Sequence, residues 1–357
     1  MKKRLDQLKQ TAKSQGQEAV LITSTANVYY LSDFYCNPKE RFLGLLLYTD
    51  EREPAIICPK METSLAIDAG WTHDIIGYED TENPLEKIPF VSSLAIEEDH
   101  LIVARYNELK RLQPSLSLSS IDGALLALRA AKDDEEIVRL QEAAEFADIA
   151  VELGVSVLRE GVSELEVIAH IESELKAKGI TKMSFDPVVL FGPNAANPHG
   201  KPGTSTLKRG DAVLMDLGVM WKGYASDITR TVFFGEPTSA HRHVYETVLE
   251  ANEAGISACV AGDQIKQADI AARNVIERAG FGEYFTHRLG HGLGIEVHEA
   301  PSMHGNNEER LENGMALTVE PGIYQSGDIG VRIEDDIIVT VNGPLVLTRY
   351  PKTLQII

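Results

Sequence analysis

A strand, a tight turn and a returning strand, with an aspartate on each strand, constrain the second half of the chain most strongly. Residues 213–233 alternate as two strands would, and Lys222 and Gly223 lie between them. If these two residues form the whole loop, Asp216 faces Thr229. Because side chains alternate faces along a strand, Asp216 and Asp227 then lie on one face as diagonal neighbours. A three-residue loop without a bulge would place them on opposite faces.

A second pair of carboxylates repeats this arrangement about a hundred residues later. One strand ends at Glu320, a loop runs over residues 321–328, and residues 331–334 return as a strand. Alternation then places Arg332 and Glu334 on the same face, which makes Arg332 a candidate for binding substrate. A single acid in such a hairpin is usually solvated. Two hairpins with a glycine-flanked histidine between them favour a site instead.

That histidine is His291, in the segment Gly290-His291-Gly292. A glycine pattern of this kind is a weak signal for dinucleotide binding, and here the required helix and acidic residue do not follow. Four carboxylates and one imidazole form the ligand set that a pair of divalent cations needs. The carboxylates would also repel one another unless cations cancelled their charge, so we expect metal removal to lower the melting temperature and abolish activity.

Two further histidines gain interest from their positions relative to this set. His199 follows a strand in a loop rich in turn-forming residues, and His298 returns seven residues after His291. Taken alone, each would be interpreted as structural.

Length and composition predict two domains in a protein without a nucleic-acid or membrane partner. A chain of 357 residues exceeds the usual size of a single core. Residues 1–122 alternate strands and helices as a small α/β domain, and residues 123–357 read as an α+β domain of antiparallel hairpins covered by helices. The net charge of −20 argues against binding to nucleic acid or anionic membranes.

The cysteines and the start of the chain predict a cytoplasmic location. The three cysteines are few, odd in number and widely spaced, which indicates buried thiols rather than a disulfide framework. The N-terminal residues are basic and polar, unlike the apolar core of a signal peptide.

These motifs resemble those of the metal-dependent proline peptidases of the pita-bread fold, which include Xaa-Pro dipeptidase (prolidase) and aminopeptidase P. The similarity spans nearly the whole chain, and the segment 27–34 resembles the creatinase-type N-terminal domain of the larger members. That domain argues against methionine aminopeptidase, whose simplest members lack it. The resemblance rests on Met215–Gly218, Ser226–Thr231, Gly290–Gly292, Val297–Glu299, Val319–Tyr324 and Arg332–Asp335.

The resemblance implies a role for each matching residue. Asp227 and Glu334 would bridge two divalent metals, Asp216 would complete one site, and His291 with Glu320 would complete the other. The expected metal is Mn²⁺, with Co²⁺, Fe²⁺ or Zn²⁺ as alternatives.

The resemblance also implies a surrounding set of catalytic and substrate-binding residues. Glu320 would accept a proton from the attacking water, and His199 and His298 would hydrogen-bond the substrate and the tetrahedral intermediate. Arg332 would bind a carboxylate or carbonyl on the proline side, and the remaining pocket positions match His287 and Tyr324.

The implied activity is hydrolysis of the Xaa-Pro bond in dipeptides by a water bridging two metals, carried out by a cytoplasmic homodimer. An aminopeptidase P that releases the first residue of longer Xaa-Pro peptides is the alternative. A catalytically silent peptide-binding module is a third possibility, although such relatives typically lose metal ligands.

Overall fold

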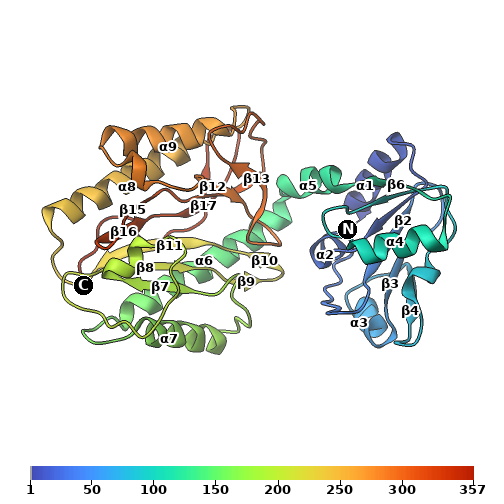
Figure 1. Cartoon of the computed structure of the whole chain (residues 1–357), viewed down its shortest axis with the longest axis horizontal. Coiled ribbons are helices and arrows are strands. Elements are labelled where there is room, and N and C mark those ends of the chain that lie inside the picture. The colour runs from blue at the N-terminus through green and yellow to red at the C-terminus, as the bar shows by residue number, and fades with distance from the viewer. Residues whose placement is uncertain (1) are drawn as a thin grey trace. The chain divides into compact units, whose positions relative to one another are not determined.

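The structure, a computed structural model, describes residues 2–357 and consists of two compact units that divide between Arg129 and Ala130. Figure 1 shows the elements of both units. The division expected after residue 122 falls at the start of α5 (Asp122–Ala130), the helix that leads from one unit to the other along the chain. Met1 lies outside the described residues.

The first unit is a mixed sheet of six strands in the order β4-β3-β2-β1-β5-β6. Parallel pairs (β1 with β5, β5 with β6, β3 with β4) stand beside antiparallel pairs (β1 with β2, β2 with β3), so the expected small α/β domain is present. Its strands are β1 (Ala19–Ile22), β2 (Gly44–Tyr48), β3 (Ala55–Pro59), β4 (Asp74–Tyr78), β5 (Ser93–Ile96) and β6 (Ser117–Ser120). Its other helices are α1 (Lys2–Ser14), α2 (Thr25–Ser32), η1 (Lys60–Glu62), α3 (Thr63–Asp68), η2 (Pro84–Lys87) and α4 (Val103–Leu112).

The second unit begins with two helices whose starts are set by capping boxes. Asp133 caps α6 (Asp134–Ser156) together with Glu136, and Ser163 caps α7 (Glu164–Ala177) together with Glu166. In each box, both side chains satisfy backbone N–H groups that the first helical turn leaves unpaired. The later helices are α8 (Ser239–Ser257), α9 (Lys266–Arg278) and the short η3 (Gly192–Ala196) and η4 (Gly282–Tyr284).

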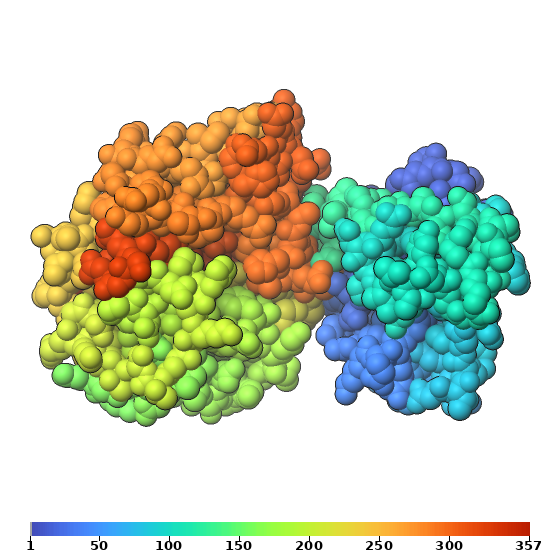
Figure 2. Space-filling model, in the orientation of Figure 1, coloured from blue at the N-terminus to red at the C-terminus, as the bar shows by residue number. Residues whose placement is uncertain are grey.

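The strands of the second unit pair antiparallel in every sheet, as the hairpin pattern predicts. One group comprises β7 (Val188–Phe191), β8 (Ala212–Leu217), β9 (Met220–Trp221), β10 (Tyr224–Ala225) and β11 (Ile228–Phe233). The other comprises β12 (Gly290–Gly292), β13 (Glu299–Met303), β14 (Ala316–Val319), β15 (Gly322–Gln325), β16 (Ile329–Arg332), β17 (Asp335–Ile338) and β18 (Leu345–Val346). In the space-filling view, the yellow-green segment that contains β7–β11 lies against the orange segment that contains α9, β12 and β13 (Figure 2).

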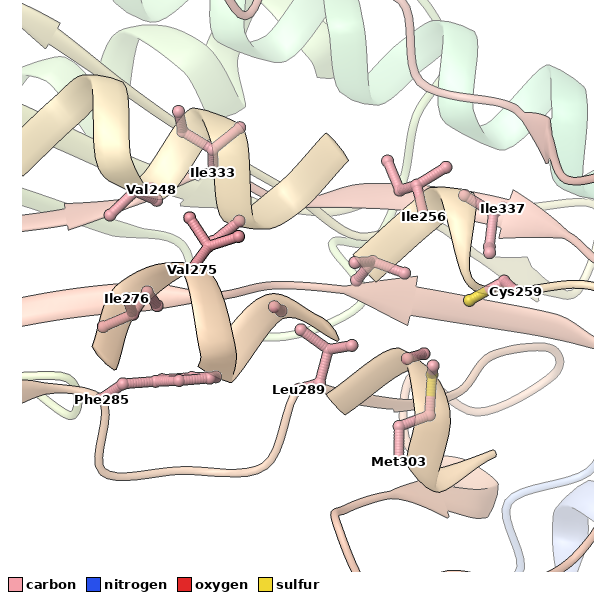
Figure 3. Packing of buried hydrophobic residues seen from close by; sticks show 14 of the residues in the cluster. Val248, Ile256, Cys259, Val275, Ile276, Phe285, Leu289, Met303, Ile333 and Ile337 are labelled. Carbon is pink, nitrogen blue, oxygen red and sulfur yellow. The ribbon is translucent and has the colours of Figure 1, made fainter. Parts of the chain in front are cut away.

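Apolar side chains of α8 and α9 pack on the strands that carry the second pair of carboxylates. Val248 and Ile276 belong to the same buried cluster as Val331 and Ile333, and Figure 3 shows part of this packing. β16 ends at Arg332, so the predicted strand over residues 331–334 is two residues too long. Val331 and Ile333 are nevertheless buried in this core, whereas Arg332 and Glu334 line a cavity. The predicted alternation is therefore confirmed.

Two predictions about the chain as a whole also have an outcome. All three cysteines are buried and free within residues 2–357, as expected of small apolar side chains. Across the same residues no helix has both the length and the apolar character needed to span a bilayer.

Candidate metal centre

The first pair of aspartates has the predicted register. Lys222 and Gly223 form a two-residue loop and both have positive φ, 47° and 82°, as a tight hairpin turn requires. Asp216 on β8 is paired with Thr229 on β11, so Asp227 lies diagonally across on the same face. Of the two loop lengths that the sequence left open, the structure has the two-residue loop, which places both aspartates on one face.

Glycine is required at position 218, where the hairpin leaves β8. A Cβ there would lie 2.0 Å from the carbonyl oxygen of Ser226 and 2.1 Å from the hydroxyl of Ser184. Neither distance is possible between non-bonded atoms, so only glycine fits at this position, two residues after Asp216.

The second pair of carboxylates lies where two paired strands end. Glu320 follows β14 and Glu334 precedes β17, and these strands pair Val319 with Asp335. The predicted loop over residues 321–328 is partly wrong, because Gly322–Gln325 form β15 and pair with β16. Pro321, Gly322 and Gly327 surround Ile323 and Tyr324 and mask the strand propensity of these two residues.

His291 is held in β12 between β13 and β14. Its Nδ1 lies 3.0 Å from the carbonyl oxygen of Gly292, so the Nδ1–H donates there and the lone pair is on Nε2. Nε2 lies 3.4 Å from Glu320 and 3.8 Å from Asp227. A backbone partner on one ring nitrogen and carboxylates near the other is the usual setting of a metal-binding imidazole.

The five residues converge on one cavity of about 390 Å³. Potential ligand atoms of Asp227, His291 and Glu334 all lie within 4.8 Å of one another, and Asp216 and Glu320 line the same cavity. Oδ1 of Asp227 is buried without a hydrogen-bond partner among the described residues. Since a buried carboxylate oxygen is normally satisfied, an unpaired one on a residue that lines a cavity with an imidazole and further carboxylates fits a cation.

The electrostatics of the cavity favour protonated carboxyls in the absence of a cation. Burial first, and then the neighbouring carboxylates, raise the pKa of Asp227 and Glu334 well above its ordinary value. Burial also raises the pKa of Glu320 to about 7. Burial lowers the pKa of His291 to about 3, so its imidazole is neutral at pH 7 and available as a ligand.

Arg332 lines the cavity but is already bonded at each of its nitrogens. Nε donates to the hydroxyl of Thr229 at 3.0 Å, one terminal nitrogen donates to the hydroxyl of Tyr324 at 2.9 Å, and the other pairs with Asp216. The guanidinium therefore orients a proposed metal ligand, a contact that strand alternation alone did not predict.

The remaining predicted residues lie on or just behind the cavity wall. His199, His287 and His298 line it, and the rings of His298 and His291 meet edge to face with centroids 4.2 Å apart. Tyr324 is behind the wall, where its hydroxyl lies 3.0 Å from Nε2 of His287.

Two residues of the site escaped the sequence reasoning. Arg288 lines the cavity with an exposed side chain and donates to the hydroxyl of Ser302 at 2.9 Å. Arg288 belongs to no alternating or helical pattern in the sequence, so nothing in the sequence indicates that its side chain lines the cavity. The sequence predicts Thr229 only as the residue opposite Asp216, and nothing local indicates that its hydroxyl meets Glu334, 105 residues away.

Comparison with known proteins identifies the family of each part of the chain. The sequence pattern of metallopeptidase family M24 matches residues 138–341, and that of the creatinase/prolidase N-terminal domain matches residues 4–131. A putative dipeptidase of Bacillus subtilis is 48% identical, with 99% of each chain covered.

Two solved structures share the fold of the whole chain. The Xaa-Pro dipeptidase of Bacillus anthracis is 35% identical with a TM-score of 0.93, and 99% of each chain is covered. The X-Pro aminopeptidase of Thermotoga maritima is 30% identical with a TM-score of 0.87, covering 96% of this chain and 98% of that one.

These matches confirm the predicted fold class, a creatinase-type α/β domain followed by an α+β catalytic domain of the pita-bread type. The two family patterns together cover most of the chain, and a relative that is 48% identical is matched over 99% of both chains. These matches establish the family. The chain belongs to metallopeptidase family M24 and is a peptidase with a creatinase/prolidase N-terminal domain.

Proposed function

We propose that the chain hydrolyses the Xaa-Pro bond of dipeptides, using two divalent cations, expected to be Mn²⁺. The residues that would bind the two cations are Asp216, Asp227, His291, Glu320 and Glu334. The observation that carries the proposal is the convergence of these carboxylates and a neutral imidazole on one cavity, including an unpaired buried oxygen of Asp227. Bound there, the cations would supply an acidified water for attack on the scissile carbonyl.

The other cavity residues would bind the substrate and move protons. Glu320, which lines the cavity beside His291, would accept a proton from the attacking water. Burial lowers the pKa of His298, so its neutral ring can donate a hydrogen bond to the oxygen that becomes negative during attack. His199, on the cavity wall, would hold the substrate backbone in the same way.

The guanidinium group of an arginine on the cavity wall, Arg288 or Arg332, would bind the substrate carboxylate. A dipeptide carries its carboxylate directly after proline, and a planar guanidinium binds such a group with two parallel hydrogen bonds. Arg332 is bonded within the protein at all three nitrogens, whereas Arg288 donates to Ser302 and otherwise faces the cavity. We therefore add Arg288 to Arg332 as a candidate for this contact.

Cleavage of Ala-Pro and Ala-Pro-Ala by the Mn²⁺-reconstituted protein tests the proposal. We expect a higher kcat/KM for Ala-Pro, and we expect Arg288→Met to raise KM for Ala-Pro more than for Ala-Pro-Ala. Arg242→Met, which alters an exposed pair with Glu236, is the matched control. Comparable or better cleavage of the tripeptide would refute the dipeptidase assignment and favour the aminopeptidase, which the likeness to the Thermotoga maritima structure keeps as the second candidate.

Elemental analysis separates both enzymes from a silent peptide-binding module. We expect two equivalents of metal after reconstitution, and less than one equivalent would support the module. The resemblance to proline peptidases also carries the expectation of a homodimer, which sedimentation of the intact protein would test.

A further inference from the structure

A single hydroxyl group connects the proposed metal ligand Glu334 to Arg332. Thr229 lies on β11, and its side chain is fully buried. Oγ1 of Thr229 lies 2.6 Å from Oε2 of Glu334 and 3.0 Å from Nε of Arg332. Thr229 is not one of the five proposed ligands, and its contact with Glu334 joins residues 105 apart in the chain, so the contact is evident only in the folded chain.

The direction of both hydrogen bonds follows from the groups involved. A guanidinium has donors and no acceptor, so Arg332 must donate to the threonine oxygen. The hydroxyl has one hydrogen, and it is left to donate to Glu334. A donor directed at one oxygen fixes the orientation of the carboxylate, and hydrogen-bond partners of this kind orient metal ligands.

The same chain of contacts continues to the other pair of carboxylates. Arg332, placed by Thr229, pairs with Asp216, which is opposite Thr229 in the β8–β11 ladder. Thr229 thus contacts Glu334 directly and Asp216 through Arg332. One buried hydroxyl stands between carboxylates contributed by two different hairpins.

We propose that Thr229 is a positioning residue that orients Glu334 for the cations and holds Arg332 against Asp216. The inference rests on the proposed function, because it presupposes that the cavity binds divalent metal. It adds a residue outside the ligand set whose loss weakens metal binding while every ligand remains in place.

The chain contains a matched control two residues along the same strand face. Thr231 is 1% exposed, its hydroxyl donates to the carbonyl oxygen of Arg332 at 3.0 Å, and it accepts from the backbone N–H of Arg332 at 3.3 Å. Thr231→Val therefore removes a buried hydroxyl with two partners from β11 without touching a carboxylate. Any general weakening of this strand should affect both valine variants alike.

The test measures Mn²⁺ binding to the metal-free full-length protein by titration calorimetry, alongside kcat/KM for Ala-Pro. We expect Thr229→Val to bind Mn²⁺ roughly 10 to 100 times more weakly, the usual effect of removing a hydrogen-bond partner of a metal ligand. Thr229→Ser keeps the hydroxyl and should stay within about threefold of the wild type, and Thr231→Val should do the same.

Each outcome separates this inference from the function on which it rests. A wild-type protein that binds no Mn²⁺ would refute the proposed metal-dependent function itself. A wild type that binds Mn²⁺ while Thr229→Val binds it equally well would overturn only the role of Thr229, as would an equal loss in Thr231→Val or a full loss in Thr229→Ser. If Thr229→Val lacks the wild-type circular dichroism spectrum, Thr229→Ala decides by the same criteria.

Discussion

Replacing Glu320 by glutamine should make the metal-free protein more stable at neutral pH, although it removes a proposed metal ligand. Burial raises the pKa of Glu320 from its ordinary 4.5 to about 7, so the folded state retains a proton that the unfolded chain releases. The stabilisation from this proton is complete below pH 4.5 and is lost as the pH rises through 7. Glutamine has the shape of the protonated acid and does not ionise.

The size of the effect follows from the shift. Each pKa unit corresponds to about 1.4 kcal/mol, so a shift from 4.5 to about 7 is worth roughly 3 kcal/mol. The side chain is 18% exposed, and solvent screening reduces this to about 2 to 3 kcal/mol. For a unit of this size, we expect the melting temperature of Glu320→Gln, relative to that of the wild type, to rise by roughly 4 to 12 °C as the pH increases from 4.5 to 7.

Thermal unfolding of the chelator-treated proteins, followed by circular dichroism from pH 4.5 to 8, measures this difference. His287 and His291, whose pKa values burial lowers to about 4 and 3, contribute the opposite slope below pH 6.5. Both histidines remain in the two proteins, so their contribution largely cancels in the difference. Glu308→Gln is the control, because this exposed carboxyl is paired with Lys266, has a lowered pKa and stays ionised throughout.

Adding Mn²⁺ should reverse the order of stability. The wild type should then melt above Glu320→Gln at pH 7, because the cation binds the folded state and needs the ionised ligand. A difference between the metal-free proteins that stays constant from pH 4.5 to 7 would refute the raised pKa. The absence of a reversal with Mn²⁺ would refute the role of Glu320 as a ligand.

Two substitutions test how the surrounding fold supports the site. Arg230→Met removes a fully buried partner of Asp335 and should cost about 3 kcal/mol in urea unfolding, the low end for a broken buried pair, because Lys352 also contacts Asp335 at 2.8 Å. Arg242→Met at the exposed pair should cost less than about 1 kcal/mol, and equal losses would contradict the argument. Gly218→Ala should cost more than about 4 kcal/mol, because its Cβ would meet two oxygens at 2.0 and 2.1 Å. Gly123→Ala, with no atom within 4 Å of its Cβ, should be neutral in the same assay, and a Gly218→Ala protein as stable as the wild type would contradict the close approach.

Local patterns were enough to predict the first hairpin and the ligand residue types. Lys222-Gly223 indicates a two-residue turn with a three-residue loop as the alternative, and once the turn is known, the period of two along a strand determines that Asp216 is opposite Thr229. The alternation of Val331 and Ile333 with Arg332 and Glu334 is likewise a property of a few neighbouring residues. These features depend on the chain over about ten residues, which is why they can be read without the fold.

The contacts that complete the site join residues far apart in the chain. β15 pairs with β16, and Pro321 and Gly322 at its start mask the strand propensity of Ile323 and Tyr324. The contacts of Arg332 with Asp216 and of Thr229 with Glu334 span 116 and 105 residues, and Arg288 reaches the cavity from a segment without periodicity. By itself the sequence determined which groups could bind cations and on which strand faces they lie, since both follow from residue type and local geometry. Only the tertiary structure decided how those groups are oriented, hydrogen-bonded and buried, because these properties depend on strands that meet only when the whole unit has folded.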